Sequence, residues 1–291
     1  LILGVFLITG LLIWWANGIS AVDKNNKTPQ TFVIPPGAGI KRIANDLKEQ
    51  KLIKDPTVFY LLVKQMGIEK KIQAGSYRLN QSQNAKQIAK NLTVGTQDVW
   101  ITIPEGKRAT EVAEILEKNM QGYDPSWEDE LIANEGYLFP DTYLFPKDAT
   151  ISLIITTMRG TFDQKFAEVK NTTNLTDAQV VTLASMIERE AITDEEKPVI
   201  SGIIQNRLDE DMALQIDATI QYVKGRTGAW WKPVLLSEYK SVQSPYNTYL
   251  NPGLPPGPIS NPGLPALKAA ADPEDTDYFF YLHDQNGKIR Y

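Results

Sequence analysis

The chain opens with an uncharged apolar stretch, LILGVFLITGLLIWWANGISAV, which covers residues 1–22. At a rise of about 1.5 Å per residue, a helix of this length can cross a hydrocarbon core of about 30 Å. Trp14 and Trp15 would then lie near one interface of the membrane, where indole rings are enriched. The stretch predicts a transmembrane helix over residues 1–22, with the rest of the chain on one side of the membrane.

A cleaved signal peptide is the alternative for this stretch. The apolar run is longer than the usual hydrophobic region of a signal peptide, and Ile19–Ala21 matches the small-residue cleavage pattern poorly. Because the chain does not begin with Met, we expect further residues before Leu1. Without them the charge-bias rule cannot orient the helix.

The composition narrows the chemistry open to the rest of the chain. Its 291 residues are too many for one small module and predict two or three. The absence of cysteine excludes disulfides and thiolate sites, and the single histidine, His283, excludes a multi-histidine metal site. A net charge of −5 without a basic tract argues against nucleic acid as a partner. Chemistry therefore falls to carboxylates, Tyr, Lys or Ser, and no cofactor is expected.

A strand-turn-helix pattern occurs twice in the first half of the chain, once in TFVIPPGAGIKRIANDL and again in ITIPEGKRATEVAEIL. Two copies are too few for a solenoid, so we expect two small units, each of which opens a module. The aligned pairs are Ile34 with Ile103, Pro35 with Pro104, Gly37 with Gly106, and Leu47 with Leu116.

The first module is expected to follow a polar linker over residues 23–30. Its pattern of strand, helix, helix and short strand is that of a small carbohydrate-binding module such as LysM, and the alternative is an unrelated unit with the same order. We therefore assign a LysM-like βααβ module to residues 31–98 and a mixed α+β domain to residues 99–291. The fold class is α+β.

Aromatic residues and carboxylates occur together in EGYLFPDTYLFP, residues 135–146. Two prolines exclude a long helix here, so a structured loop or short strand is expected. Rings beside carboxylates, such as Glu135 and Asp141, are typical of sugar-binding clefts, because sugar C–H faces pack on rings while hydroxyls need acceptors. The alternative is a buried aromatic loop that only packs.

The stretch NLTDAQVVTLASMIERE predicts a buried helix that ends in two carboxylates. Thr176 and Gln179 form a capping box at its start, and Val180–Ile187 is apolar almost all round. At about 100° per residue, Glu188 and Glu190 lie on different sides of the helix. Either carboxylate could be buried. The alternative for Glu190 is an ordinary helix-end carboxylate paired with Arg189 or Lys197.

The remaining motifs place polar side chains among apolar ones or in a long loop. MALQIDATIQYV holds Gln215 and Asp217, and the Pro- and Gly-rich loop Ser244–Gly263 contains the sequence YNTY. Loops of this length are functional or disordered, and the tyrosines favour order. A hairpin with Asn286-Gly287 at its turn is expected near the end, and it predicts a truncated C-terminus.

Five motifs now point to one family. In order, EGYLFPDTY, LASMIERE, NRL with LQIDATIQY, YNTY and GLPPGPISNPG resemble the motifs of the endolytic murein transglycosylases, also called YceG-like proteins. The match runs from the apolar N-terminal stretch almost to Tyr291. The resemblance implies one N-terminal membrane helix, a LysM-like subdomain, a catalytic domain on the extracytoplasmic side of the cell membrane, and peptidoglycan glycan strands as the substrate.

The resemblance also implies the reaction and its acid. Family members cut the MurNAc-GlcNAc β-1,4 bond within glycan strands and leave 1,6-anhydro-N-acetylmuramoyl ends. Their essential glutamate corresponds to the second Glu of the E-x-E pair, Glu190. A membrane-held enzyme meets strands near where they are made, so peptidoglycan synthases are expected neighbours.

One carboxylate can perform this reaction, whereas ordinary glycosidases use two. The substrate's own C6 hydroxyl is the nucleophile, so Glu190 must be neutral near pH 7, donate a proton and then accept one. Burial against apolar side chains of its helix would raise its pKa in this way. The residues expected to bind substrate are Glu188, Gln215, Asp217, Tyr246, Asn247, Thr248 and Tyr249.

Two other functions stay open at this stage. The first is a hydrolytic muramidase, with Glu190 as the acid and Asp217 or Glu135 as its partner. The second is a non-catalytic wall-binding scaffold, for which Glu190 would be dispensable. The alternative for Asp217 is a residue that caps a turn, and the alternative for the YNTY stretch is a loop that packs without binding substrate. His283 is assigned no role.

Overall fold

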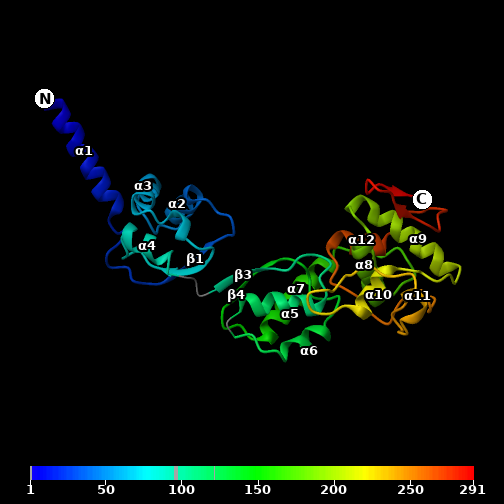
Figure 1. Ribbon diagram of the computed structural model, residues 1–291. Coiled ribbons are helices and arrows are strands. Elements are labelled where there is room, and N and C mark those ends of the chain that lie inside the picture. The colour runs from blue at the N-terminus through cyan, green and yellow to red at the C-terminus, as the bar shows by residue number, and fades with distance from the viewer. Residues whose placement is uncertain (1, 95–97, 121) are drawn as a thin grey trace. The chain divides into compact units, whose positions relative to one another are not determined.

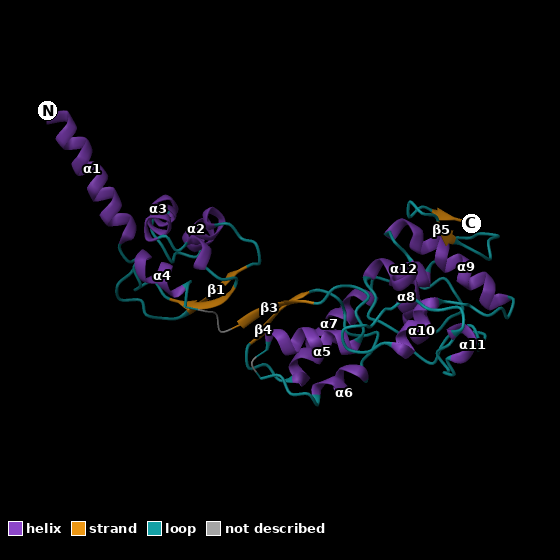
Figure 2. Ribbon diagram, viewed as in Figure 1, coloured by secondary structure: helices purple, strands orange, loops and turns teal. Residues whose placement is uncertain are grey.

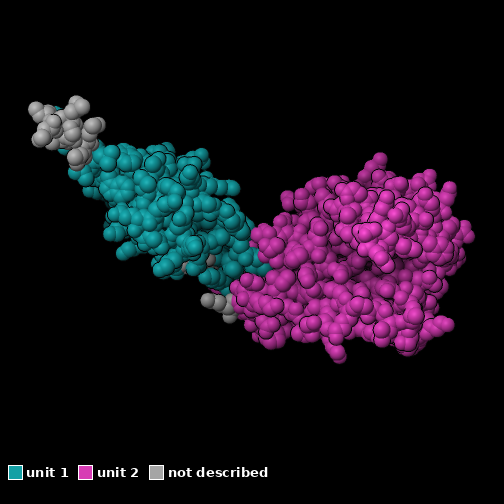
Figure 3. Space-filling view, turned by 45° about the horizontal axis from the view of Figure 1, so that its top comes forward, with its two compact units in different colours: residues 1–101, 144–147 teal, residues 102–143, 148–291 magenta. Residues whose placement is uncertain are grey.

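The structure is a computed structural model that describes residues 2–94, 98–120 and 122–291 (Figure 1). The chain divides into two compact units (Figure 3). Unit 1 comprises residues 1–101 with 144–147, and unit 2 comprises residues 102–143 with 148–291. Helices and two-stranded sheets occur together (Figure 2), which confirms the predicted α+β class.

Unit 1 contains a strand, two helices and a second strand in the predicted order. The strands β1 (Gln30–Ile34) and β2 (Gly75–Leu79) pair antiparallel, with Phe32 opposite Tyr77. Asp55 starts the second helix by accepting hydrogen bonds from two backbone N–H groups of its first turn. The helices are α2 (Ile40–Glu49), α3 (Pro56–Met66), the short η1 (Glu69–Lys71) and α4 (Ala85–Asn91). The likeness of this unit to LysM stays a prediction.

The N-terminal stretch forms helix α1 (Ile2–Ile19). The C-terminal end of α1 packs against the rest of unit 1. Trp15 and Ile19 contact the core of the unit, and the Trp14 indole N–H donates to the Asp55 carboxylate at 2.9 Å. No helix in the part of the chain that the structure describes is both long and apolar enough to cross a membrane. The predicted helix is therefore present, but its membrane-spanning assignment is not confirmed.

The second copy of the repeat follows the first closely in backbone geometry. Gly37 and Gly106 both have left-handed φ angles, 75° and 70°, which glycine adopts at little cost. The helix after each turn starts at an aligned position, α2 at Ile40 and α5 (Ala109–Asn119) at Ala109. The strand before the second turn, β3 (Asp98–Thr102), pairs with β4 (Thr142–Pro146).

Unit 2 is built around helix α8 (Asp177–Glu190), which begins at the predicted capping box of Thr176 and Gln179. Every residue from Val180 to Ile187 is buried, as the apolar pattern predicts. Helices α12 (Leu264–Ala271) and α9 (Lys197–Asp209) pack against α8. The other elements of this unit are α6 (Trp127–Ile132), α7 (Ile151–Phe166), η2 (Asp194–Glu196), α10 (Asp217–Lys224), α11 (Glu238–Ser241), β5 (Leu282–His283) and β6 (Ile289–Arg290).

Two irregular segments complete unit 2. The Pro- and Gly-rich loop is ordered, and Ser260 and Asn261 are fully buried in it. The terminal hairpin β5–β6 forms as predicted, with Gly287 at a φ of 74° in its turn. Both segments reach the C-terminal end of α8, because Gly263 of the loop bonds to Glu188 and Tyr281, just before the hairpin, bonds to Glu190.

Candidate active site

Glu190 is the last residue of α8, and its side chain is partly buried. Its Oε2 accepts a hydrogen bond of 2.8 Å from the Tyr281 hydroxyl, and the Ala218 backbone N–H also bonds to this carboxyl group. Burial raises the pKa of the Glu190 carboxyl, the bond from Tyr281 lowers it, and the charge of Asp217 raises it again. The net direction is upward, as a proton donor at neutral pH requires.

Asp217 begins helix α10 near Glu190. Its Oδ1 accepts a hydrogen bond of 2.6 Å from the Tyr249 hydroxyl, and the ring of Tyr249 stacks on Tyr239 at 4.1 Å between centroids. This bond links the Asp217 carboxylate at the first position of α10 to the Pro- and Gly-rich loop. Asp217 is therefore held beside Glu190 as a negative charge.

Glu188 occupies a different environment two residues earlier. Its Oε1 accepts from the Lys197 ammonium at 3.1 Å, and its Oε2 accepts from the Gly263 backbone N–H at 3.0 Å. The Lys197 and Glu188 side chains are only 4% and 8% exposed. Protein groups thus satisfy both oxygens of Glu188, which favours a role in holding α8, α9 and the loop together. Substrate binding by Glu188 stays a prediction.

Arg189 and Lys197, the expected partners of Glu190 in the alternative reading, are both engaged elsewhere. Lys197 pairs with Glu188, and the Arg189 guanidinium stacks over the Trp231 ring at 4.0 Å from its centroid. The structure instead gives Glu190 a tyrosine partner that the sequence reasoning missed. Tyr281 lies in the segment before β5, and its pKa is raised well above the ordinary value, mainly by burial.

Arg207 positions the segment that carries Tyr281. Its Nε donates to the Phe279 carbonyl at 2.6 Å, and its Nη1 donates to the Leu214 carbonyl at 2.6 Å. One guanidinium on α9 therefore ties the segment before β5 to the segment before α10. The first segment carries Tyr281, and the second leads into Asp217 at the start of α10. Arg207 therefore helps to bring both side chains toward Glu190 at the end of α8.

The remaining predicted binding residues divide into buried and accessible ones. Asn247 and Thr248 are buried: Asn247 donates to the Val242 carbonyl at 2.8 Å, and Thr248 Oγ1 accepts from the Ile216 N–H at 2.9 Å. They hold the loop and the start of α10 in place. Tyr246 is partly buried against Tyr222, while Gln215 is exposed and has a positive φ of 53°. Contact of any of these residues with substrate stays a prediction.

A second buried carboxylate, Glu135, lies at the N-terminal end of α5. Both of its oxygens accept from the Ala109 N–H, at 2.9 and 3.0 Å, and Oε1 accepts from the Asn261 amide at 3.1 Å. Burial raises the pKa of Glu135 to about 7, although the Ala109 N–H and the charge of Arg108 act to lower it. Asp141, the other acid of this motif, is exposed and bonds to the N–H of Thr142.

His283 also has a partner. Its Nε2 lies 3.2 Å from Oε2 of Glu196, a carboxylate that further accepts from the Ile192 N–H at 3.0 Å. Hydrogen bonds from Ile192 and His283 outweigh partial burial and lower the pKa of Glu196. The ring of His283 faces the edge of the Tyr281 ring, so this pair supports the position of Tyr281.

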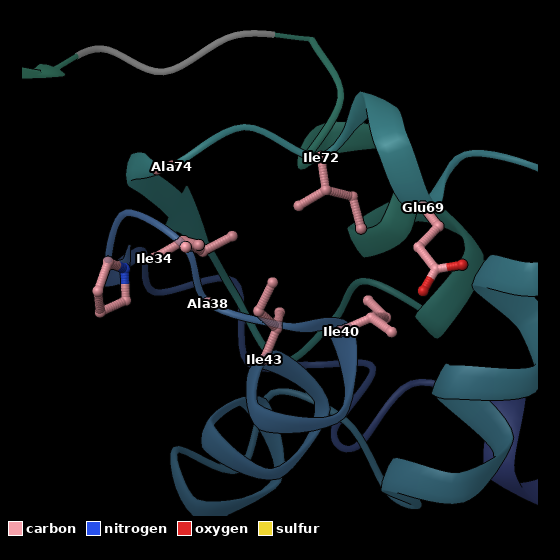
Figure 4. Close-up of a pocket in the computed structure, with 9 residues that line it drawn as sticks. Ile34, Ala38, Ile40, Ile43, Glu69, Ile72 and Ala74 are labelled. Atoms are coloured by element: carbon pink, nitrogen blue, oxygen red, sulfur yellow. The ribbon is translucent and has the colours of Figure 1, made fainter.

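Unit 1 has a cavity of its own, with a volume of about 260 Å³. Figure 4 shows the side chains of Ile34, Ile40, Ile43 and Ile72 around it, with Glu69 at one side. The lining comes from the end of β1, the turn after it and α2, and from η1 and the segment between η1 and β2. Apolar side chains line much of the cavity, but polar atoms make up more of its exposed lining, and the charged residue Glu69 is among the lining residues.

Comparison with known proteins places these features in a family context. The model of the YceG-like family matches residues 32–291. An endolytic murein transglycosylase of Bacillus subtilis (strain 168) is 30% identical, over 97% of this chain and 86% of that protein. A protein of the same name from Streptococcus pneumoniae serotype 2 (strain D39) is 28% identical over 93% of this chain, which spans 57% of that longer protein.

A solved structure has a similar fold. The crystal structure of a putative yceG-like protein from Listeria monocytogenes superposes with a TM-score of 0.55 at 30% sequence identity. The superposition covers 91% of this chain and 96% of that chain.

Proposed function

Because the chain belongs to the YceG-like family, we propose that it is a lytic transglycosylase that cuts murein glycan strands. The observation that carries the proposal is the state of Glu190. It is a partly buried carboxyl group at the end of a buried helix, its pKa is raised, and a tyrosine and a second carboxylate lie beside it. This is the environment that a single carboxyl group needs to act first as an acid and then as a base.

In the proposed reaction, protonated Glu190 donates its proton to the oxygen of a MurNAc-GlcNAc β-1,4 bond. The C1–O bond breaks, and positive charge develops on the muramic acid ring. The C6 hydroxyl of the same sugar attacks C1, and its proton passes to the Glu190 carboxylate. The products are a free 4-hydroxyl group on one strand and a 1,6-anhydro end on the other. No water is consumed, and Glu190 is protonated again.

Tyr281 and Asp217 have distinct roles in this scheme. Tyr281 donates to Oε2 of Glu190 and so holds the carboxyl group that carries the mobile proton. The negative charge of Asp217 favours protonated Glu190 before the reaction. The same charge would stabilise the positive ring as the glycosidic bond breaks. The attack by a tethered hydroxyl group gains further from proximity.

The mass of the product ends tests this reaction. Purified murein is digested with the enzyme, and the strand ends are measured by mass spectrometry. We expect anhydro ends, which weigh about 18 Da less than hydrolytic ends because no water is added. Reducing ends alone would identify a hydrolytic muramidase, with Asp217 as the second carboxylate. No cleavage at all would favour a non-catalytic wall-binding scaffold.

We also propose that unit 1 binds glycan through the cavity of Figure 4, which combines isoleucine side chains with polar atoms and the Glu69 carboxylate, as sugar sites do. Substitution of Ala38, which lines the cavity, by Trp would fill it. Sedimentation with insoluble murein should then retain less of the Ala38→Trp variant than of the wild type. Equal retention would contradict the proposal.

Finally, we propose that the enzyme works on the extracytoplasmic side of the cell membrane, where murein lies, and that residues 1–22 hold it there. Support comes from the uncharged sequence of this segment and from its exposed apolar side chains, which include Phe6, Leu11, Leu12 and Ile13. The test is fractionation of cells that express the chain with or without residues 1–22. Equal amounts in the membrane fraction would overturn this proposal.

A further inference from the structure

A basic pocket lies at the C-terminal end of α10, in unit 2 and outside the group around Glu190. Its volume is about 180 Å³. Three of its lining residues are cationic and none is acidic, although the whole chain carries a net charge of −5. The lining residues are Gln221, Lys224, Gly225, Arg226, Ala229, Trp230 and Lys232.

The positive charge of this pocket is only partly neutralised by the protein. Lys224 pairs with Glu238, a carboxylate from α11 that also accepts from the Leu235 N–H. Arg226 and Lys232 are exposed, and among the residues that the structure describes neither has an ion-pair partner. Two cations are therefore free to bind an anionic group that enters the pocket.

The aromatic wall of the pocket is held rigidly. The Trp230 indole N–H donates to the Glu114 carboxylate at 3.1 Å, and the Arg108 guanidinium stacks on the ring at 4.8 Å from its centroid. Arg108 in turn donates to the Tyr222 carbonyl at 2.8 Å and stacks on the Tyr222 ring. A side chain that is already fixed loses little entropy when a ligand packs on it.

Helix α10 relates this pocket to the proposed site of cleavage. The helix starts at Asp217, beside Glu190, and ends at Lys224, which lines the pocket. At about 1.5 Å per residue, its two ends are about 10 Å apart. An anionic group in the pocket would therefore belong to the same substrate as the bond at Glu190, but not to the reacting sugar ring itself.

We infer that this basic pocket binds a carboxylate of the peptide stem on murein. The inference rests on the proposed function. Murein offers two carboxylate sources on muramic acid: the free lactyl group of a strand without peptides, and the carboxylates of the stem. A lactyl group is a short carboxylate on a sugar ring, whereas a stem also carries apolar side-chain atoms, so the aromatic wall formed by Trp230 favours the stem. Apolar stem atoms would pack on Trp230.

The test compares two substrates with the full chain. Initial rates are measured on peptide-bearing murein and on the same murein after an amidase has removed the stems. The wild-type enzyme should have the higher kcat/KM on peptide-bearing strands. In the double variant Arg226→Gln/Lys232→Gln, the ratio of the two kcat/KM values should fall by about fivefold to tenfold, which is what two partly exposed ion pairs contribute. The loss should come from a higher KM on peptide-bearing strands.

A matched control removes two charges elsewhere in unit 2. Lys170 and Lys268 are exposed and line a separate hollow beside α12, so Lys170→Gln/Lys268→Gln should keep the wild-type ratio. A wild-type ratio in the Arg226→Gln/Lys232→Gln variant would overturn the inference, as would a wild-type enzyme without preference for either substrate. Both results leave anhydro products in place, so they are distinguishable from failure of the proposed function, in which no anhydro ends form.

Discussion

The two sides of the C-terminal end of α8 carry carboxylates in opposite environments. Glu188 faces a buried lysine and a backbone N–H, and its charge is compensated by the protein. Glu190 faces a tyrosine and a second carboxylate, and its pKa is raised. The two residues have the same chemistry and are separated by one arginine. Their surroundings alone set them apart, and only those of Glu190 raise its pKa, as the proposed proton donor requires.

Glu135 adds a second contrast. It is also buried, and its pKa is raised to about 7, yet both of its oxygens accept from the backbone at the start of α5. Glu190 instead accepts from the Tyr281 hydroxyl as well as from a backbone N–H, and it remains partly exposed. A raised pKa is therefore not enough to identify an acid catalyst, because the proton must also reach a substrate.

The largest effect is expected from Glu190→Gln, which keeps the shape of the side chain but removes its proton. We expect kcat on murein to fall by roughly 10²–10⁴-fold. The melting temperature should change by less than about 2 °C, since no buried charge pair is broken. Glu195→Gln is the matched control, because Glu195 is an exposed carboxylate close by in the sequence. Wild-type activity in Glu190→Gln would contradict the proposal that Glu190, and not Glu188, is the proton donor.

The next effect concerns stability on the Glu188 side. Glu188→Ala leaves Lys197 buried with only the exposed Asp194 as its partner. We expect a loss of about 3 kcal/mol in the free energy of unfolding, which lowers the melting temperature by about 6–12 °C for a unit of this size. The variant Glu188→Leu/Lys197→Met should recover most of this loss, because it buries no charge. An unchanged melting temperature in Glu188→Ala would show that the Glu188–Lys197 ion pair does not stabilise the fold.

Asp217→Asn sharpens the comparison on the Glu190 side. Asn keeps an acceptor for Tyr249 but loses the charge, so kcat should fall by about 10–100-fold. The charge of Asp217 raises the pKa of Glu190, and its removal lowers that pKa. Activity needs protonated Glu190, so the alkaline limb of the pH profile of kcat/KM should move to lower pH. A limb that stays in place would mean that Asp217 does not act on Glu190.

Tyr281→Phe should have the smallest effect on kcat. It should move the alkaline limb of the pH profile in the opposite direction from Asp217→Asn. The hydrogen bond from Tyr281 lowers the pKa of Glu190, so its loss raises that pKa and moves the alkaline limb to higher pH. We expect kcat to fall by less than about tenfold, as for the loss of one hydrogen bond. Tyr278→Phe, at an exposed tyrosine nearby, should leave the limb unchanged. Movement of the limb to lower pH in Tyr281→Phe would contradict the assigned role of this bond.

Local patterns predicted the elements of the fold well. The capping box at Thr176 and the apolar run to Ile187 identified α8, and the aligned glycines at 37 and 106 identified two equivalent turns. These features depend on neighbours within a few residues, which a sequence shows directly. The order of strand, helix, helix and strand in unit 1 was predictable for the same reason.

Long-range partners were harder to predict. Tyr281 lies 91 residues from Glu190, and no spacing rule connects a strand-like segment to the end of a distant helix. Lys197 was expected as a possible partner of Glu190, but the turn before α9 brings it to Glu188. Asn247 and Thr248 were expected to bind substrate because they are polar; the bonds from their side chains to the Val242 carbonyl and the Ile216 N–H were not predicted, and their contact with substrate stays a prediction.

The protonation state of Glu190 is the central claim, and it can be measured directly. The protein is labelled with 13C at the glutamate side-chain carboxyl carbon, and the signals are followed by NMR as the pH is changed, with Glu190→Gln used to assign the signal of Glu190. We predict that Glu190 titrates above the ordinary glutamate pKa of about 4.3, in the direction that burial and Asp217 impose. Titration at or below that value would mean that Glu190 is ionised at neutral pH, and the proposed acid step would fail.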